Sequence, residues 1–332
     1  MYPKIENMDA LQQIRQPIEE EMGRYKQVFD TYLQHSNPLL QEVLNALSRR
    51  RGKMVRPMLT LLSAKLGGNE VNAQAIRAAA AFEFFHTASL VHDDIVDESD
   101  ERRGQQSINS THGNQVAVLV GDFILANALL CASKTENPKL IEILSTAAQC
   151  LACGELLQLD HVHQETISEA VYFDIIQNKT AALFAACAEA GIRSVSSDEV
   201  TIQTMREFGT CIGICFQIRD DIFDYQHGAK IGKPTGNDMQ EGKLTLPVIH
   251  ALLTTGDESM SALARRVKMR QASQEEIATL VSFTKANGGI DYAVETMNRY
   301  AEKAKRLLDQ FPSSDVKQAL LTYVDFVIDR QL

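Results

Sequence analysis

Two short acidic motifs have the residue types and spacing to bind metal ions. The first is formed by Asp93, Asp94 and Asp97, in the run D-D-I-V-D at the end of a long apolar stretch. On a helix, Asp93 and Asp97 share one face, and Asp94 lies beside them. Three carboxylates within one turn repel one another unless a cation sits among them. Such oxygen ligands suit Mg²⁺, although a solvated acidic helix end is an equal alternative for a single motif.

The same spacing occurs a second time. Asp220, Asp221 and Asp224 repeat it within CFQIRDDIFDY, again at the end of an apolar helical stretch. Gln217 and Gly213 continue the face of Asp220 toward the start of that helix, at i−3 and i−7. Two acidic clusters that face each other in one helical domain would form a cage for several Mg²⁺ ions around a diphosphate. The second copy therefore favours metal binding over a solvated helix end.

Basic residues lie close to both acidic motifs in the sequence. Taken singly, each is more often a surface charge than a ligand, but their placement around two acidic motifs favours phosphate binding. Arg fits a phosphate through its planar fork, and Lys supplies a compact charge. The candidate cations are Arg51, Lys53, Arg56, Arg102, Arg103, Lys179, Lys233 and Lys243.

The composition limits the partners of the chain. Of 332 residues, 45% are apolar, which is ample for a buried core. Lys and Arg number 33 and Asp and Glu 43, so the net charge is 33 − 43 = −10. Such an acidic chain is a poor generic binder of nucleic acid or of an anionic membrane. An anionic ligand must therefore be held by local cations or by a metal.

Signals for targeting and for disulfides are weak. The N-terminal segment lacks the apolar core of a signal peptide. The longest apolar run, 117–130, is broken by Asp122 and Asn127 and is predicted to be too short to span a bilayer. Of six cysteines, Cys150 and Cys153 form a C-x-x-C without a second pair at zinc spacing, so the cysteines are predicted to be buried small residues. We expect a reduced, cytoplasmic protein without a transmembrane segment.

Nearly the whole chain is predicted to be helical. Asn37-Pro38 and Asn137-Pro138 each place an Asn cap before a Pro at the first helical position. Thr166 and Glu169 resemble a capping box that opens a helix through Ala190, which Gly191 would end. Without alternating β-branched runs, repeats or linkers, the chain is predicted to form one all-α domain over residues 1–332. Further predicted helices span 71–97, 115–134, 138–160, 198–226 and 288–309.

Between about Arg51 and Pro247, the sequence resembles the trans-isoprenyl diphosphate synthases, or trans-prenyltransferases. The family often reads G-G-K-R-x-R-P where this chain has Arg51 and Met54 in place of the first Gly and the first Arg. The resemblance implies a bundle of antiparallel helices around a deep central cavity, usually as a homodimer. The matching segments are GKMVRP, FFHTASLVHDDIVDESDERRG, GDFILA, GELLQLD, Lys179-Thr180, FQIRDDIFDY and IGKPTGNDMQEGKLTLP.

The resemblance also implies the reaction. An allylic diphosphate would be joined head to tail to isopentenyl diphosphate, repeatedly, with about three Mg²⁺ (or Mn²⁺) shared between the two acidic motifs. The metals would neutralise the leaving diphosphate, so that the allylic cation forms and the alkene of isopentenyl diphosphate attacks it. No side-chain nucleophile is needed. The product, a polyprenyl chain for a quinone or another carrier, would be handed to the membrane.

The basic and polar residues take roles by resemblance. Thr180 and Gln217 would place oxygen dipoles near the developing cation. His86 lies seven residues before Asp93, on the same helical face, although a His on an apolar helix is commonly only a satisfied core residue. Isopentenyl diphosphate would contact Lys53, Arg56, His86 and Arg103. The allylic diphosphate would contact Arg102, Lys179, Lys233 and Lys243.

Three alternatives stay open on the sequence alone. A class I terpene cyclase also uses D-D-x-x-D and Mg²⁺, but it has no need for the second diphosphate site formed by Lys53, Arg56 and Arg103. A non-catalytic partner subunit would be expected to lose an acidic motif or the basic set, and this chain keeps both. The third alternative is a short-chain synthase that makes farnesyl or geranylgeranyl diphosphate.

Product length is predicted from small residues before the first motif. Ala88 and Ser89, five and four residues before Asp93, leave room for a growing chain, where short-chain family members commonly carry a bulky residue. Small residues chosen only for helix packing are the alternative. Leu144 shares a helical face with Glu155 and lies roughly 16 Å farther along that helix, at 1.5 Å per residue, so it could form the tunnel floor. We therefore predict a long-chain synthase similar to the octaprenyl enzymes, with a product of about C30 to C50.

Overall fold

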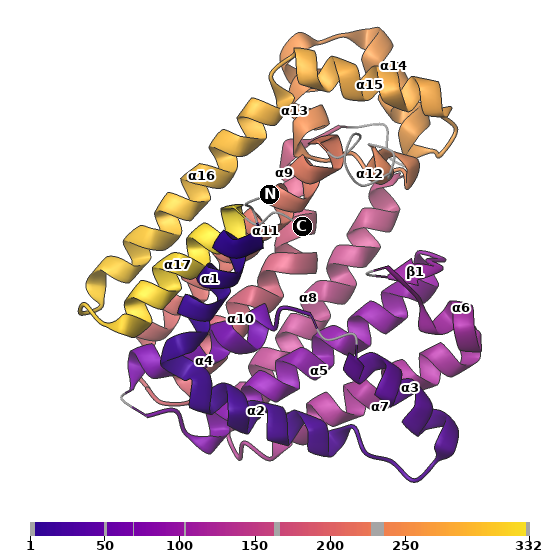
Figure 1. Ribbon diagram of the computed structural model, residues 1–332. Coiled ribbons are helices and arrows are strands. Elements are labelled where there is room, and N and C mark those ends of the chain that lie inside the picture. The colour runs from indigo at the N-terminus through magenta and orange to yellow at the C-terminus, as the bar shows by residue number, and fades with distance from the viewer. Residues whose placement is uncertain are drawn as a thin grey trace. The chain divides into compact units, whose positions relative to one another are not determined.

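A computed structural model describes residues 4–49, 52–68, 70–102, 104–162, 167–226 and 236–329, and nearly all of them are helical (Figure 1). Across these ranges, the strands are limited to one antiparallel hairpin, in which β1 (Glu101–Arg102) pairs with β2 (Gln105–Gln106). The predicted all-α class is confirmed. The first helices are α1 (Lys4–Arg15), α2 (Glu19–Tyr32), α3 (Pro38–Arg49), α4 (Val55–Gly67), α5 (Ala73–Val96), α6 (Ile108–His112) and α7 (Asn114–Ser133).

The remaining helices complete the chain, which divides into two compact units. The first unit comprises Met1–Ala148, Phe184–Arg206 and Gln310–Thr322, and the second comprises Gln149–Leu183, Glu207–Asp309 and Tyr323–Leu332. The single-domain prediction for residues 1–332 stays a prediction. The remaining helices are α8 (Pro138–Val162), α9 (Glu169–Ile176), α10 (Ala182–Arg193), α11 (Glu199–Gln226), α12 (Asn237–Gln240), α13 (Leu246–Thr255), α14 (Glu258–Lys268), α15 (Gln274–Ala286), α16 (Gly289–Leu307) and α17 (Asp315–Asp329).

The two Asn-Pro pairs begin helices as predicted. The side-chain oxygen of Asn37 accepts a hydrogen bond from the Leu40 amide at 3.1 Å, and α3 begins at Pro38. The side-chain oxygen of Asn137 accepts one from the Lys139 amide at 3.1 Å, where α8 begins. An Asn cap satisfies an amide that has no partner within the helix, and Pro at the next position has no amide to satisfy.

The predicted capping box and helix end around residues 166–191 were wrong. The cap is Ser168, whose hydroxyl accepts a hydrogen bond from the Val171 amide at 3.4 Å, while Thr166 lies outside the described residues. The helix does not end at Gly191 but continues to Arg193. A Cβ on Gly191 would lie 2.1 Å from the Thr60 carbonyl oxygen, so this glycine allows α10 to pack closely against α4. Gly191 is therefore a packing residue rather than a C-cap.

Helix α5 lies at the centre of the first unit. It packs against α4, α7 and α2, and its alanines 78–81 are buried. Phe84 stacks on Phe29 of α2 with ring centroids 4.0 Å apart. A helix that is buried on most sides is held by contacts all round. These contacts therefore fix the orientation of α5 and, with it, the position of the acidic motif at its end.

The second unit has its own core. Helix α13 packs against α16, α15 and α9, and its Val248 and Leu252 are buried. Tyr225, near the end of α11, joins the same cluster with Val267 and Leu280. The hydroxyl of Tyr225 lies 3.4 Å from the Thr245 hydroxyl, within hydrogen-bond distance. This core anchors the acidic end of α11.

Two helices bear on the prediction about membrane spans. By length and composition alone, α7, which extends beyond the apolar run 117–130 at both ends, and residues Pro138–His161 of α8 are long and apolar enough to cross a bilayer. Core helices of soluble proteins pass the same test, and Ala117, Val120 and Ile124 of α7 are buried within the first unit. The two helices therefore do not by themselves indicate a membrane protein.

The cysteines follow the prediction only in part. All six are free thiols, and Cys131, Cys187, Cys211 and Cys215 are buried. The C-x-x-C pair differs, because one of its thiols is half-buried and the other is exposed on α8. Burial raises the pKa of the Cys131 thiol to about 11 and that of Cys187 to about 12. These thiols are therefore inert packing residues.

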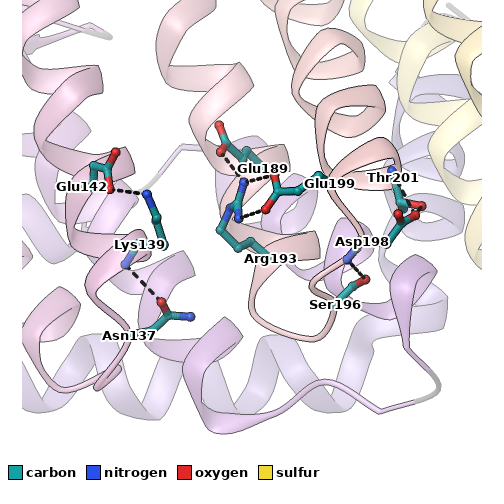
Figure 2. Close-up of polar contacts among 9 residues, drawn as sticks. All are labelled: Asn137, Lys139, Glu142, Glu189, Arg193, Ser196, Asp198, Glu199 and Thr201. Carbon is teal, nitrogen blue, oxygen red and sulfur yellow. Dashed lines mark hydrogen bonds and ion pairs between the residues drawn. The ribbon is translucent and has the colours of Figure 1, made fainter.

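In one corner of the first unit, polar contacts join the end of α10 to the start of α11 and a further ion pair lies within the start of α8 (Figure 2). Arg193, at the end of α10, donates to Glu199 of α11 at 2.8 Å, and Glu189 lies 3.4 Å from the same guanidinium. At the start of α8, Lys139 pairs with Glu142 at 2.8 Å. Each of these carboxylates faces a cation.

Candidate active site

The first acidic motif occupies the last turn of α5. Asp94 is buried, at 6% exposure, and forms an ion pair with the guanidinium of Arg102 in the following hairpin. Asn109 donates to the Asp94 carbonyl oxygen at 3.2 Å, which ties the next segment to this turn. Asp93 is half-buried and Asp97 is exposed. The motif therefore presents two accessible carboxylates one turn apart and keeps the third in an ion pair.

The predicted isopentenyl diphosphate site is partly assembled in the first unit. Arg56, in the first turn of α4, lies with its Nη1 2.9 Å from Nε2 of His86 on α5. Because a guanidinium can only donate, Nε2 of His86 is the acceptor in this hydrogen bond. The Arg56 guanidinium also lies 4.6 Å from the centroid of the Phe184 ring. Lys53 is exposed just before this helix.

A pocket in the first unit gives these groups a common lining. On α5, His86 and Asp94 line it together with the small residue Thr87. Gly52 and Arg102 line it from the segments before α4 and after α5. The bonds and the pocket thus place the predicted residues Arg56, His86, Asp94 and Arg102 near one another. Arg103 and Arg51 lie outside the described residues.

The second acidic motif occupies the last two turns of α11. Asp221 is buried, at 2% exposure, and both of its carboxylate oxygens accept hydrogen bonds. The donors are the Tyr172 hydroxyl at 2.6 Å and the Gln217 side-chain amide at 2.9 Å. Burial raises the pKa of Asp221 to about 7, against the effect of these two bonds. Asp220, by contrast, is exposed.

A further carboxylate, Asp238, joins this motif, and the sequence analysis missed it. Asp224 accepts from the Asn237 amide at 2.9 Å and the Asp238 amide at 3.2 Å, which brings α12 next to the motif. Burial, together with the charges of Asp221 and Asp224, raises the pKa of Asp238 well above its usual range. Burial also raises the pKa of Asp224. Asp238 lies in the matching segment IGKPTGNDMQEGKLTLP, but its spacing from the D-D-x-x-D motif gave no signal.

Lys179 and Thr180 lie on a turn of π-helix. Residues Gln177–Ala181 form this turn between α9 and α10. Turns of π-helix are rare and frequently occur at functional sites. The Lys179 ammonium pairs with the Glu155 carboxylate of α8 at 2.7 Å, and the Thr180 hydroxyl donates to the Gln217 side-chain oxygen at 2.9 Å.

These bonds form a continuous chain in the second unit. It runs from Thr180 through Gln217 to Asp221 and Tyr172. All four residues line one pocket with Lys179 and Lys243, whose ammonium pairs with the Glu241 carboxylate at 2.6 Å. Four of the predicted catalytic residues of this unit, Lys179, Thr180, Gln217 and Asp221, therefore line one pocket. Lys233 lies outside the described residues.

The two motifs belong to different units. Asp93, Asp94 and Asp97 lie in the first unit, and Asp220, Asp221 and Asp224 lie in the second. The prediction that the two clusters face each other stays a prediction. So do the metal-ligand and substrate roles of the individual residues.

The chemistry of the donors fits Mg²⁺. Among the residues that the structure describes, no group of three or more His, Cys, Asp or Glu side chains gathers closely enough to hold a metal ion by itself. Mg²⁺ usually binds through one or two carboxylates and keeps water and substrate phosphates as its other ligands. Asp220 and Asp224, one turn apart at the end of α11, supply such a set. The raised pKa of Asp224 and of Asp238 reflects a loss of solvation and a crowding of charge that a divalent cation would relieve.

Fold and site together define a class of protein: a helical protein with two D-D-x-x-D motifs, each contributing a carboxylate to a pocket that is also lined by basic side chains. Residues 37–284 match the polyprenyl synthetase family, and the chain belongs to that family. It is therefore a prenyltransferase. This excludes the terpene cyclase alternative.

Individual relatives are similar to this chain over almost its full length. The octaprenyl diphosphate synthase of Haemophilus influenzae is 33% identical over 328 residues, which cover 98% of this chain and 99% of that protein. A solved decaprenyl diphosphate synthase from Rhodobacter capsulatus is 34% identical, with a TM-score of 0.90, and the match covers 96% of this chain and 99% of that chain. These proteins share the all-α isoprenoid synthase fold, so the predicted fold class is confirmed.

A third similar protein has a shorter product in its name. A solved geranylgeranyl pyrophosphate synthase from Bacteroides thetaiotaomicron is 46% identical to this chain, with a TM-score of 0.85. The match covers 97% of this chain and 100% of that chain. The family membership is thus shared by long-chain and short-chain relatives.

Proposed function

We propose that this protein is a Mg²⁺-dependent long-chain trans-polyprenyl diphosphate synthase. It condenses isopentenyl diphosphate head to tail onto an allylic diphosphate and repeats the step to about C30 to C50. The observation that carries the long-chain assignment is the pair Ala88 and Ser89 on α5, small side chains at 1% and 7% exposure just before the first acidic motif. The octaprenyl and decaprenyl relatives support the same assignment.

The residues of the second unit act on the allylic diphosphate. Lys179 and Lys243 bind its diphosphate group, and Asp220 and Asp224 hold Mg²⁺ beside it. Mg²⁺ held by Asp220 and Asp224 would neutralise charge on the leaving diphosphate and so would favour cleavage of the bond between carbon and oxygen. The hydroxyl of Thr180 and the amide oxygen of Gln217 lie next to each other and turn their dipoles toward the allylic cation.

The residues of the first unit act on isopentenyl diphosphate. Lys53 and Arg56 bind its diphosphate, and His86 holds the Arg56 guanidinium in place at 2.9 Å. The alkene of isopentenyl diphosphate then forms the new carbon–carbon bond to the allylic cation. The proton lost from the adjacent carbon passes to the released diphosphate, and the elongated allylic diphosphate is the product.

We also propose that the enzyme works in the cytoplasm as a homodimer through the exposed face of α7. Val118, Leu119, Leu129 and Leu130 are 42%, 67%, 50% and 49% exposed, and their spacing places them in one stripe along the helix. These side chains and exposed Asp122 on the same side of the helix form a largely apolar patch of the kind that a partner can cover. Light scattering is expected to report a dimer, and Leu119→Lys is expected to give a monomer. A monomeric unmodified protein would contradict this.

A second candidate is a short-chain synthase that makes geranylgeranyl diphosphate. The 46% identical relative from Bacteroides thetaiotaomicron favours it. The two candidates share the chemistry and differ only in the residue that stops the chain. For the long-chain candidate we assign this role to Leu144, which is buried at 2% exposure on α8.

Product analysis separates the two candidates. The purified chain alone, with isopentenyl diphosphate and the C10 primer geranyl diphosphate, is expected to give products of about C30 to C50 by chromatography. Ser89→Phe is expected to shorten them to about C15–C20, and Leu144→Ala to lengthen them. A C20 product from the unmodified enzyme that Ser89→Phe leaves unchanged would favour the short-chain candidate. Failure of the chain alone to make any product would indicate that it needs a partner subunit.

A further inference from the structure

Two glycines contact the π-helical turn that carries Lys179 and Thr180. Gly154 comes from α8, and a Cβ there would lie 2.7 Å from the Lys179 amide nitrogen and 3.0 Å from the Asn178 Cβ. Gly213 comes from α11, and a Cβ there would lie 2.4 Å from the Ala181 Cα. Real Cβ atoms essentially never come this close to backbone atoms, and backbone cannot rotate away as a side chain can. Only glycine fits at either position.

Both glycines lie in the interior of long helices, where glycine is unfavourable. Gly154 is residue 17 of the 25 in α8, and Gly213 is residue 15 of the 28 in α11. Glycine in a helix interior loses more backbone entropy on folding than alanine does. A glycine in such a place usually has a packing or functional reason. Here the reason is the close approach of two helices to one short turn.

Each glycine is coupled to a residue that holds a functional side chain. Glu155, which follows Gly154 directly, pairs with the Lys179 ammonium at 2.7 Å. Gln217, one helical turn after Gly213, accepts from the Thr180 hydroxyl at 2.9 Å. Each helix therefore holds the turn twice, once by backbone contact and once by a polar bond to the side chain.

We propose that Gly154 and Gly213 are positioning residues for the condensation, which fix the π-helical turn so that Lys179 meets the allylic diphosphate and Thr180 meets the developing cation. The proposal rests on the proposed roles of Lys179 and Thr180. Neither glycine touches substrate. A shift of the turn by a fraction of an ångström moves both functional groups, because Lys179 and Thr180 lie within the five residues Gln177–Ala181.

The test compares four glycine-to-alanine variants. Gly154→Ala and Gly213→Ala introduce the two contacts with the π-helical turn. Gly191→Ala is the matched control for a buried clash, since its Cβ would lie 2.1 Å from the Thr60 carbonyl oxygen in the first unit. Gly23→Ala is the control for the substitution itself, because nothing lies within 4 Å of its Cβ. For each variant, kcat and the two KM values are measured per mole of folded protein, together with the melting temperature.

The expected pattern separates positioning from stability. Gly154→Ala raises KM for the allylic diphosphate at least tenfold, and Gly213→Ala lowers kcat at least tenfold, since a displacement of about 1 Å can cost a factor of about 100 in rate. KM for isopentenyl diphosphate changes less than about twofold. Gly191→Ala lowers the melting temperature and leaves the kinetic constants of the folded protein unchanged. Gly23→Ala does not lower the melting temperature and leaves the kinetic constants unchanged. If the first two variants behave as Gly191→Ala does, the proposal is overturned.

A variant without a clash covers the case in which the alanine variants do not fold. Ala181→Gly removes the Cβ that would lie 2.9 Å from a Cβ at Gly213, so it loosens the contact instead of crowding it. We expect a several-fold loss in kcat with KM for isopentenyl diphosphate unchanged, and unchanged kinetics would overturn the proposal. Lys179→Ala is measured in parallel. If Lys179→Ala leaves turnover and KM for the allylic diphosphate unchanged, the proposed function has failed. If Lys179→Ala changes them but the glycine variants leave them unchanged, only the positioning role of the glycines has failed.

Discussion

The two ends of helix α11 carry carboxylates in opposite environments. At its start, Glu199 accepts from the Arg193 guanidinium at 2.8 Å, and Asp198 accepts from the Thr201 hydroxyl and amide (Figure 2). These bonds hold the pKa of Glu199 and of Asp198 below their usual range. At its other end, burial raises the pKa of Asp221 to about 7 and also raises that of Asp224.

The difference separates structural acids from functional ones on one helix. At the start of α11, charges are matched by donors, so ionisation of the carboxylates stabilises the fold. At its end, Asp221 lines a pocket together with Asp238 of α12, so ionisation of these buried carboxylates destabilises the fold until a cation neutralises their charge. Strongly perturbed pKa values of this kind cluster at functional sites. The raised pKa values therefore support the proposal that the acidic end of α11 binds a ligand.

The largest expected effect comes from removing an acid at the functional end. Asp220→Ala is expected to lower kcat by a factor of roughly 100 to 1,000, since the loss of a preorganised electrostatic group costs about that much. Asp93→Ala is expected to behave in the same way. Steady-state turnover with saturating substrates measures the effect, and circular dichroism checks that the helical fold is intact.

Glu199→Ala is the matched control from the other end of α11. It removes a carboxylate of the same charge from the same helix, so turnover is expected to stay within about twofold. Equal losses for Asp220→Ala and Glu199→Ala would mean that the contrast between the two ends has no functional meaning.

The next effect concerns two lysines, each paired with a glutamate. Lys179, paired with Glu155, is expected to bind the allylic diphosphate, whereas Lys139, paired with Glu142 in Figure 2, is a surface partner. Lys179→Ala is expected to raise KM for the allylic substrate about tenfold to a hundredfold, because a charge-assisted bond contributes roughly 1.5–3 kcal/mol. Lys53→Ala is expected to raise mainly KM for isopentenyl diphosphate. Equal shifts of the same KM by both variants would contradict the assignment of two diphosphate sites.

The sequence predicted the elements of the site better than its details. The ends of α5 and α11 follow from long apolar stretches that stop at acidic motifs, and both were predicted to within two residues. The π-helical turn at Gln177–Ala181 was not predicted, because its local sequence has no signal that distinguishes it from an α-helix. Asp238 was missed because a short helix far from the D-D-x-x-D spacing brings it to the motif through bonds to Asp224. The periodicity of apolar residues predicts which residues share one face of a helix, but it does not predict which distant segments of the chain contact that helix.

A smaller effect is the pH dependence of stability without metal. A raised pKa means that folded Asp221 holds a proton that the unfolded chain releases, so this group destabilises the fold increasingly as the pH rises from about 4 to about 7. Asp221→Asn is therefore expected to raise the melting temperature by a few degrees at pH 8 and to have little effect at pH 4.

Glu199 is expected to show the opposite sign. Its lowered pKa stabilises the fold above the usual pKa of a glutamate, and this stabilisation is lost as the pH falls through the lowered value. Glu199→Gln is expected to lower the melting temperature at pH 7, and the difference from the unmodified protein is expected to vanish near pH 3. Melting curves in chelator across this range measure both variants. If Asp221→Asn at pH 8 and Glu199→Gln at pH 7 changed the melting temperature in the same direction, the contrast between the two ends of α11 would be contradicted.

The smallest effect is expected for Lys139→Ala. The Lys139 and Glu142 side chains are 62% and 64% exposed, so their ion pair is screened by solvent. Surface pairs of this kind contribute little to stability. We expect unchanged kinetics and a melting temperature within error of the unmodified protein. A clear loss of stability would show that the corner in Figure 2 depends on this pair.

The most direct test of the central claim, that the acidic ends of α5 and α11 serve a divalent cation, is turnover in the absence and presence of Mg²⁺. The purified protein is assayed with isopentenyl diphosphate and farnesyl diphosphate in excess chelator, and Mg²⁺ is then restored in excess. We predict no condensation in chelator and full recovery with Mg²⁺, because crowded carboxylates and a diphosphate repel one another without a cation. Full turnover in excess chelator would contradict the account.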